Sequence, residues 1–235
     1  MTSPPVRRRA ARHQEPMDDD AVAIRRGPSA GRKKPITVEA IVETALAIVE
    51  REGYDALTMR RVAAALETGP ASLYAHVVNK QDLDDLLIGR LCAEITLPPT
   101  DPDSWRRQVH EVCAQLRDRY LAYPGISRAA LAMVPTDRET MRVSEGILDI
   151  LLAGGVAAQA AAWTADALLL YVAGYCLELS VARVLDRDEL KRRLTALPVQ
   201  TFPNTVRYAD ELTAGQGHDR FDFTIDLMIG RLAAR

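Results

Sequence analysis

Apolar residues recur along most of the chain at the spacing of amphipathic helices. The first stripe begins after Thr37, an expected N-cap, and ends at Gly53. No segment has the period-2 alternation of a half-buried strand, and no internal repeat is present. The pattern therefore predicts an all-α protein. Later stripes predict helices over about 105–120, 126–133, 137–153, 157–185, 188–196, 204–213 and 219–234.

Between residues 58 and 92 the pattern changes to helices that are too short to be stable alone. Thr58 is expected to cap a short helix that ends before a Thr-Gly-Pro break at 68–70. A third helix is predicted over about 70–76, and Asn79 caps the next one. Isolated helices under about 12 residues are marginal in water, so these helices must be held by mutual packing. Such an arrangement presents its second short helix as a rigid probe, which fits the major groove of DNA.

Side chains on and after the third helix suit a nucleic-acid partner. Ser72 and Tyr74 can donate hydrogen bonds to phosphates or base edges, and His76 follows. Lys80 begins the next helix, where its ammonium and the N-terminal amides can hold a phosphate. Each residue also has an ordinary alternative, such as a half-buried packing tyrosine or a surface histidine. Their order and spacing, rather than any single residue, favour DNA binding.

The run from Thr37 to Leu91 resembles the DNA-binding domain of the TetR family of bacterial transcriptional regulators. The likeness is carried by "EREGYDALT", "ALTMRRVAAAL" and "ASLYAHVVNKQDLDDLL", in the family's order and spacing over about 55 residues. The resemblance implies a three-helix unit with a helix-turn-helix at about 58–76, and contacts to phosphates from Thr58 and Lys80. The residues that it implies would face DNA are Thr58, Arg60, Pro70, Ala71, Ser72, Tyr74, His76 and Lys80.

Two features of this segment oppose DNA binding. Glu67 stands where the family usually has a glycine after the second helix. Glycine relieves strain where φ is positive, so Glu67 predicts an altered turn and adds a negative charge near DNA. Residues 35–92 also carry five Lys and Arg against nine Asp and Glu, a net charge of −4.

The first 34 residues have the opposite charge. They hold nine Lys and Arg against four Asp and Glu, a net charge of +5. Because they are rich in Pro, Gly and Arg and have no apolar periodicity, we expect a disordered basic arm. The alternative is a solubilising tail without a role in binding. The arm residues expected to grip the DNA backbone or enter the minor groove are Arg25, Arg26, Arg32, Lys33 and Lys34.

A Pro-rich link at 97–103 separates this part from the rest of the chain. We expect an arm over 1–34, a DNA-binding domain over 35–92, and a ligand-binding and dimerisation domain over 93–235. The segments "FPNTVRYADEL" and "FDFTIDLMIGRLAAR" resemble the C-terminal domain of the tetracycline-repressor-like branch.

This second resemblance implies a homodimer in which helices 157–185 and 219–234 pair with the same helices of a second subunit. The long helix is apolar over more than one face and therefore needs more cover than one chain gives. A two-fold dimer would place two recognition helices about one DNA turn apart, on a near-palindromic operator.

The same branch binds small molecules inside this helical bundle. The resemblance therefore implies a hydrophobic effector that favours a state with weaker DNA binding. Gln115, Asp166 and Glu178 are polar candidates for orienting it and could equally face solvent, and ordinary core packing is the alternative for each residue of the expected cavity. The residues expected to line its cavity are Trp105, His110, Tyr120, Tyr123, Met133, Trp163, Tyr171 and Tyr175.

No catalytic, nucleotide-binding or metal motif is present, so we expect neither an enzyme nor a cofactor. The N-terminus lacks the apolar core of a signal peptide, and the apolar run at 167–177 is too short to span a bilayer. A cytoplasmic protein without a membrane contact is expected. Its three cysteines lie far apart in apolar patterns, which indicates buried thiols: Cys92, Cys113 and Cys176.

Together these observations predict a ligand-responsive homodimeric transcriptional repressor. Two alternatives stay open. One is a helical-bundle enzyme that acts on a hydrophobic small molecule and carries a DNA-binding unit. The other is a regulator that is controlled by a partner protein instead of a ligand.

Overall fold

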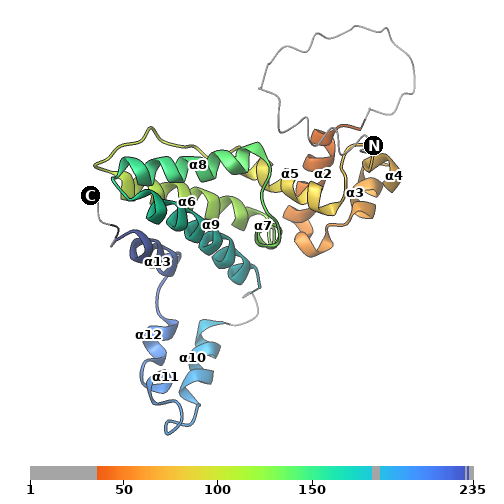
Figure 1. Cartoon of the computed structure of the whole chain (residues 1–235). Helices are drawn as coiled ribbons and strands as arrows, with labels where there is room; N and C mark the ends of the chain where they lie inside the picture. The colour runs from red at the N-terminus through yellow and green to blue at the C-terminus, as the bar shows by residue number, and fades with distance from the viewer. Residues whose placement is uncertain (1–35, 182–185, 231, 233–235) are drawn as a thin grey trace, which may run out of the picture. The chain divides into compact units, whose positions relative to one another are not determined.

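The computed structural model describes residues 36–181, 186–230 and 232, and every regular element in them is a helix (Figure 1). The predicted all-α fold is confirmed. The arm residues Arg32, Lys33 and Lys34 lie outside the described residues. The elements are α2 Val38–Glu52, η1 Tyr54–Ala56, α3 Met59–Ala65, α4 Pro70–Leu73, α5 Lys80–Cys92, α6 Trp105–Ala122, α7 Ser127–Ala132, α8 Arg138–Ala153, α9 Ala158–Val181, α10 Arg187–Thr195, α11 Pro203–Arg207, α12 Ala209–Thr213 and α13 Asp219–Gly230.

The chain divides into two compact units. The first comprises Met1–Glu94 and Ala122–Val143, and the second comprises Ile95–Leu121 and Ser144–Arg235. The segment 122–143 belongs to the first unit because α7 packs against α5. The DNA-binding segment predicted from the sequence is thus completed by residues that lie well after it in the chain.

The first unit is built on α2, which begins and ends as the sequence predicts. The Thr37 hydroxyl accepts a hydrogen bond from the Ala40 amide at 3.1 Å, and Gly53 ends the helix with a φ of 82°. The inward stripe of α2 is fully or almost fully buried and forms the base on which the short helices pack: Ile41, Val42, Ala45, Leu46, Ile48 and Val49.

The turn between α3 and α4 is closed by a residue in the left-handed region. At the end of α3 the Thr68 amide donates to the Ala63 carbonyl at 2.9 Å, and the Glu67 amide donates to the Ala64 carbonyl at 3.0 Å. This is a Schellman motif, which needs positive φ at Glu67. Glu67 has a φ of 50° and is the one non-glycine residue with positive φ in the described part of the chain. The altered turn predicted at Glu67 is therefore present as a strained residue in an ordinary motif.

Helix α4 is shorter than the predicted 70–76. It ends at Leu73, and the residues after it form turns. The Leu73 carbonyl accepts from both the His76 amide at 2.8 Å and the Val77 amide at 2.9 Å, so the chain leaves the helix after one turn. Leu73 and Val77 are fully buried, which fixes both ends of this segment.

Helix α5 starts with a capping box. The Asn79 side chain accepts from the Asp82 amide at 2.8 Å, and the Asp82 carboxylate accepts from the Val78 amide at 2.7 Å. One turn later, the buried Asp85 carboxylate accepts from the Thr136 amide at 3.1 Å and the Asp137 amide at 3.2 Å. Asp85 thereby attaches the start of α8 to α5 within the first unit.

The second unit packs α6, α9, α13 and most of α8 around apolar stripes (Figure 1). The Trp105 ring lies directly against Gly154, where a Cβ would collide with it. The Cys176 thiol donates to the Arg117 carbonyl at 3.6 Å, and its burial raises the pKa to about 12.

Helices α10 to α12 contact one another, and Ala209 is their one buried residue.

Helix α9 is longer than the apolar run at 167–177 because alanines extend it at its start. By length and composition alone it could cross a membrane, with a mean hydropathy of 1.4 over Ala158–Ser180. Core helices of bundles share this composition, and the inward side of α9 is buried in the second unit. Its buried residues include Ala161, Ala165, Leu168, Val172, Ala173, Tyr175 and Cys176.

We expect Glu67→Gly to stabilise the protein by about 0.5–1 kcal/mol, because glycine adopts positive φ without the steric cost of a Cβ. The greater freedom of glycine in the unfolded chain limits the gain. The melting temperature, followed by circular dichroism, should rise by about 1–4 °C. Glu67→Ala is the control, since it removes the carboxylate but keeps the Cβ. Equal stabilisation by both variants would assign the effect to the charge and not to the backbone.

Candidate DNA-binding surface and ligand site

The outer side of α4 is exposed while its inner side is buried. Leu73 is fully buried, whereas Tyr74 exposes 44% of its surface and Pro70 and Ala71 are also exposed. In the preceding helix α3, Val62 is buried, and its C-cap Leu66 is half-buried. The first unit therefore presents a short rod with an aromatic hydroxyl on its outer side, as a major-groove probe requires.

The hydroxyl groups near this rod already make contacts within the chain. The Thr58 hydroxyl accepts from the Arg61 amide at 3.2 Å, which caps α3. The Thr68 hydroxyl donates to the Ser72 hydroxyl at 3.0 Å. Both Thr58 and Ser72 keep a hydroxyl hydrogen that can be directed at a phosphate. His76 is half-buried at the end of the same segment.

The two arginines of α3 differ in their surroundings. The Arg61 guanidinium pairs with the Glu52 carboxylate, whose pKa is lowered by the hydrogen bond from Arg51 and next by that from Arg61. Arg60 is exposed. Of these two cations, Arg60 is thus the one whose charge is not already matched by Glu52.

Lys80 lies in a network at the start of α5. Its ammonium donates to the Tyr54 hydroxyl at 2.8 Å, pairs with the Asp84 carboxylate, and lies 4.2 Å from the centre of the Tyr54 ring. Burial, and next Asp84, raise the pKa of Tyr54, so its hydroxyl stays protonated. An ammonium has three donors, and these two hydrogen bonds use two of them. The third can bind a phosphate, so the network orients Lys80 without consuming it.

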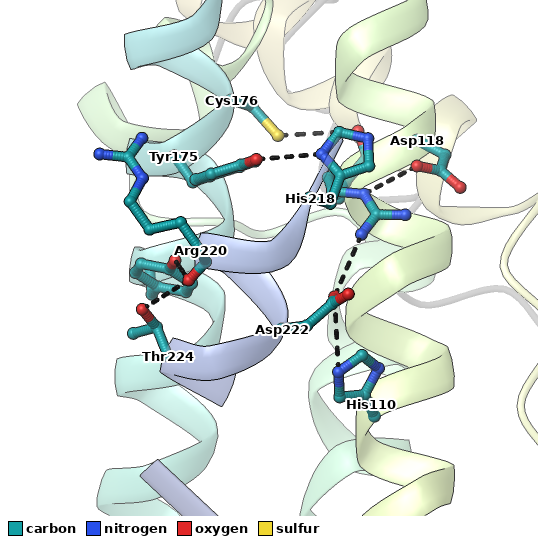
Figure 2. A network of polar contacts seen from close by, with 10 residues as sticks. His110, Asp118, Tyr175, Cys176, His218, Arg220, Asp222 and Thr224 are labelled. Atoms are coloured by element: carbon teal, nitrogen blue, oxygen red, sulfur yellow. Dashed lines mark hydrogen bonds and ion pairs between the residues drawn. The ribbon is translucent and has the colours of Figure 1, made fainter. Parts of the chain in front are cut away.

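In the second unit, a cluster of polar and aromatic residues joins α6, α9 and α13 (Figure 2). The Tyr175 hydroxyl lies 3.0 Å from His218 Nδ1, and the Tyr175 ring is 5.0 Å from that of Phe221. Arg117 is buried and its guanidinium lies 4.8 Å from the centre of the Phe221 ring. Burial raises the pKa of Tyr175. We call these residues, with His110 and Asp222, the inner cluster.

The polar edge of the inner cluster is formed by one carboxylate (Figure 2). Asp222 Oδ1 lies 3.5 Å from His110 Nε2 and 3.7 Å from the Arg117 guanidinium, which also donates to Asp118 at 2.8 Å. A half-exposed histidine, a buried cation and two aromatic rings could together bind an aromatic molecule that carries hydroxyl or carboxyl groups.

A hollow of about 360 Å³ lies between α9 and α13 and shares Tyr175 with the inner cluster. Tyr171 and Tyr175 form its wall, with ring centres 6.0 Å apart, and the Arg220 guanidinium donates to Glu178 at 2.7 Å on its rim. This contact with Glu178 raises the pKa of Arg220. The hollow is lined by Tyr171, Gly174, Tyr175, Glu178, Arg220 and Thr224.

The residues expected to line a ligand cavity have different surroundings. Trp105 and Tyr120 are buried in the second unit, and Trp163 exposes 70% of its surface to solvent. Tyr123 and Met133 are half-buried and belong to the first unit. The structure brings together Tyr171 and Tyr175, and it places His110 in the inner cluster with Tyr175.

The polar candidates also differ. The Gln115 side-chain amide makes two hydrogen bonds with the backbone of Thr96. It accepts from the Thr96 amide at 2.9 Å and donates to the Thr96 carbonyl at 3.0 Å, so it has a structural partner. Glu178 pairs with Arg220, and Asp166 is exposed.

Sequence reasoning missed four residues of the inner cluster. Phe221 is fully buried against Tyr171 and Tyr175, and in the sequence nothing distinguishes it from the other apolar residues of its helix. Arg117 is a cation next to the apolar stripe of α6, which is a signal for a buried charge. His218 and Asp222 gave no signal in the sequence, because His218 meets the cluster through Tyr175 of α9 and Asp222 meets it through two residues of α6.

The second unit also exposes an apolar surface. Trp163 and Leu170 of α9 are 70% and 60% exposed, and Phe223 and Leu227 of α13 are 68% and 60% exposed. Large apolar side chains on neighbouring helices mark a surface that another protein covers.

In the described part of the chain, no group of three or more His, Cys, Asp or Glu could hold a metal ion.

Two family models match the chain. Residues 97–235, more than half of the chain, match the model described as tetracyclin repressor-like, C-terminal domain. Residues 41–84 match the model described as bacterial regulatory proteins, tetR family.

Two curated relatives are similar to part of the chain. The HTH-type transcriptional repressor DrrR1 of Streptomyces coeruleorubidus is 37% identical over 100 residues, which are 42% of this chain and 37% of DrrR1. An HTH-type transcriptional regulator of Saccharopolyspora erythraea is 32% identical over 125 residues, or 53% of each protein. The chain thus spans about half or less of the length of these relatives.

Among solved structures, the chain is similar to ActR, a TetR family protein of Streptomyces coelicolor. Apo ActR has a TM-score of 0.77 and 38% identity over 84% of this chain and 95% of ActR. ActR has also been solved in complex with (S)-DNPA and with actinorhodin, with TM-scores of 0.78 and 0.77.

Proposed function

The chain belongs to the TetR family of bacterial regulatory proteins, and we propose that it is a cytoplasmic homodimeric repressor released from its operator by a small molecule. The observation that carries the proposal is the exposed face of α4 above the buried Leu73. A rigid one-turn rod with Tyr74 outward has no evident role in the fold of the unit. It has a clear role against DNA, where a helix enters the major groove.

On DNA, we expect Tyr74 and Arg60 to provide the main contacts from the unit itself. Lys80 and the N-terminal amides of α5 would hold a backbone phosphate beside them. Because residues 35–92 have a net charge of −4, these contacts need a further source of positive charge. The proposed source is the basic arm that precedes them, through Arg32, Lys33 and Lys34.

Two copies of the unit would bind the two halves of a near-palindromic operator. The exposed apolar surface of α9 and α13 supports a homodimer, since covering Trp163 and Phe223 removes apolar area from water. A two-fold axis through this surface would present two recognition helices to successive turns of DNA.

The effector would bind at the inner cluster of the second unit. ActR is similar to this chain over nearly its whole length and binds actinorhodin and (S)-DNPA. We therefore propose an aromatic effector with polar substituents, bound beside the packed rings of Tyr175 and Phe221 and oriented by His110 and Arg117. A ligand that binds the DNA-free arrangement more tightly shifts the population away from DNA.

Tyr74→Ala should weaken operator binding by about 10-fold or more, because one hydrogen bond to a charged phosphate is lost. The operator itself is obtained by selecting bound duplexes from a random pool. The melting temperature should stay unchanged, since Tyr74 is exposed. Leu73→Ala is the contrasting variant, with an expected loss of about 2–5 kcal/mol of stability. Unfolding by Tyr74→Ala would place that ring in the core and refute the proposed DNA-facing surface.

Replacing Arg25, Arg26, Arg32, Lys33 and Lys34 with glutamine should lower operator affinity without changing its sequence preference. The slope of log affinity against log salt should fall by about 0.9 for each phosphate that the arm neutralises. Titrations of labelled operator at several salt concentrations measure both quantities. An unchanged slope would leave the arm as a solubilising tail.

Actinorhodin and (S)-DNPA are the first compounds to test for release of the operator. A bound effector should raise the melting temperature and lower operator affinity.

His110→Ala should weaken effector binding by about 10-fold and leave operator binding intact. His76→Ala is the matched control, with the opposite expectation. If no small molecule from a wider library shifts the melting temperature, control by a partner protein becomes the better account.

A further inference from the structure

We propose that the hollow beside α9 receives the Trp163 ring of a second copy of this chain, in an antiparallel contact between the two copies of α9. The inference rests on the homodimer proposed above and adds the register in which its helices meet. The hollow is open around Gly174, where an added Cβ has no heavy atom within 4 Å. Trp163 lies on the same helix and exposes 70% of its surface.

One face of α9 alternates between large and small residues. At 3.6 residues per turn, Trp163, Ala167, Leu170 and Gly174 lie within about 60° of one another around the helix axis. Trp163 and Leu170 are largely exposed, whereas Ala167 and Gly174 are partly exposed. Along about three turns, the face therefore reads large, small, large, small.

A two-fold axis reverses this order on the facing helix. If Trp163 faces Gly174 of the second copy, Ala167 necessarily faces Leu170 of that copy, and the axis passes α9 between Ala167 and Leu170. Every large side chain then meets a small residue, which lets the two helices approach closely and fill the space between them. Shifting the register by one turn brings Leu170 or Trp163 against another large side chain or leaves the hollow empty.

The polar residues at the ends of this face fit the same register. Gln159 then faces Glu178 of the second copy, so its amide can donate to a carboxylate oxygen. Glu178 is already paired with Arg220 at 2.7 Å within its own chain. Covering the hollow therefore buries no unpaired charge. The rings of Tyr171 and Tyr175 line the hollow and can pack against the incoming indole.

The test exchanges the sizes of the two positions in the full-length chain. Gly174→Trp places two large rings in contact at both ends of the dimer, and we expect a dimer dissociation constant about 100-fold higher. Trp163→Ala leaves two empty hollows and should weaken the dimer by about 10-fold or more. A one-to-one mixture of the two variants should form a mixed dimer that is tighter than either homodimer, because each tryptophan again meets a small residue.

The double variant Trp163→Ala with Gly174→Trp should restore the homodimer for the same reason. Sedimentation velocity gives the dissociation constants, and native mass spectrometry identifies the mixed dimer. Gly230→Trp is the matched control, since Gly230 is also a helical glycine with nothing within 4 Å of an added Cβ. Mixing Gly230→Trp chains with Trp163→Ala chains should not produce a tighter mixed dimer. Circular dichroism checks that every variant is folded.

The outcomes separate this inference from the homodimer itself. A wild-type chain that stays monomeric refutes the homodimer. A dimeric wild type whose Gly174→Trp variant stays equally dimeric, or shows no rescue in the mixture, refutes the register and leaves the homodimer standing. Loss of effector binding by Gly174→Trp with an intact dimer would assign the hollow to a ligand and overturn the inference.

Discussion

Burial of Leu73 is the interaction on which the proposed DNA-facing surface depends. Helix α4 is a single turn, far below the length at which a helix persists in water, and its N-cap Gly69 has no side chain to close it. Leu73, Val62, Ala63 and Val77 are buried together, and each large apolar side chain contributes about 1.5–3 kcal/mol. The burial of the adjacent Leu73 therefore fixes the position from which Tyr74 is presented.

The same constraint explains which parts of the first unit could be predicted. Caps and breaks are local, so Thr37, Gly53 and Asn79 were assigned correctly from the sequence. The length of α4 was wrong, because nothing local ends a helix at Leu73. Its end is set by the burial of Val77 and by the two amides that share the Leu73 carbonyl. The strain at Glu67 was predictable only as a departure from a pattern that has glycine there.

In the second unit, periodicity predicted the helices but not which of their faces meet. A helical stripe distinguishes apolar from polar positions, yet it cannot say whether an apolar position faces its own core or another protein. Trp163 and Tyr175 were both assigned to one cavity, whereas one is exposed and the other is buried against Phe221. Arg117 of α6 lies beside Asp222 of α13, and no spacing within one helix encodes a contact between two helices.

Helix α9 contributes to both the inner cluster and the exposed apolar surface, because none of its sides is polar enough to face water alone. Its inner face carries Tyr175 into the cluster with Phe221, and its outer face carries Trp163 and Leu170 to the exposed surface. A helix is stiff over a few turns, so a ligand that moves Tyr175 also displaces the outer residues of the same turns. A dimer contact that requires large residues to meet small ones tolerates little displacement, since close-packed interfaces lose contacts steeply with distance. On the proposed function, effector binding and the geometry of the dimer would thereby be coupled through one helix, and by reciprocity the dimer contact would in turn influence the affinity for the effector.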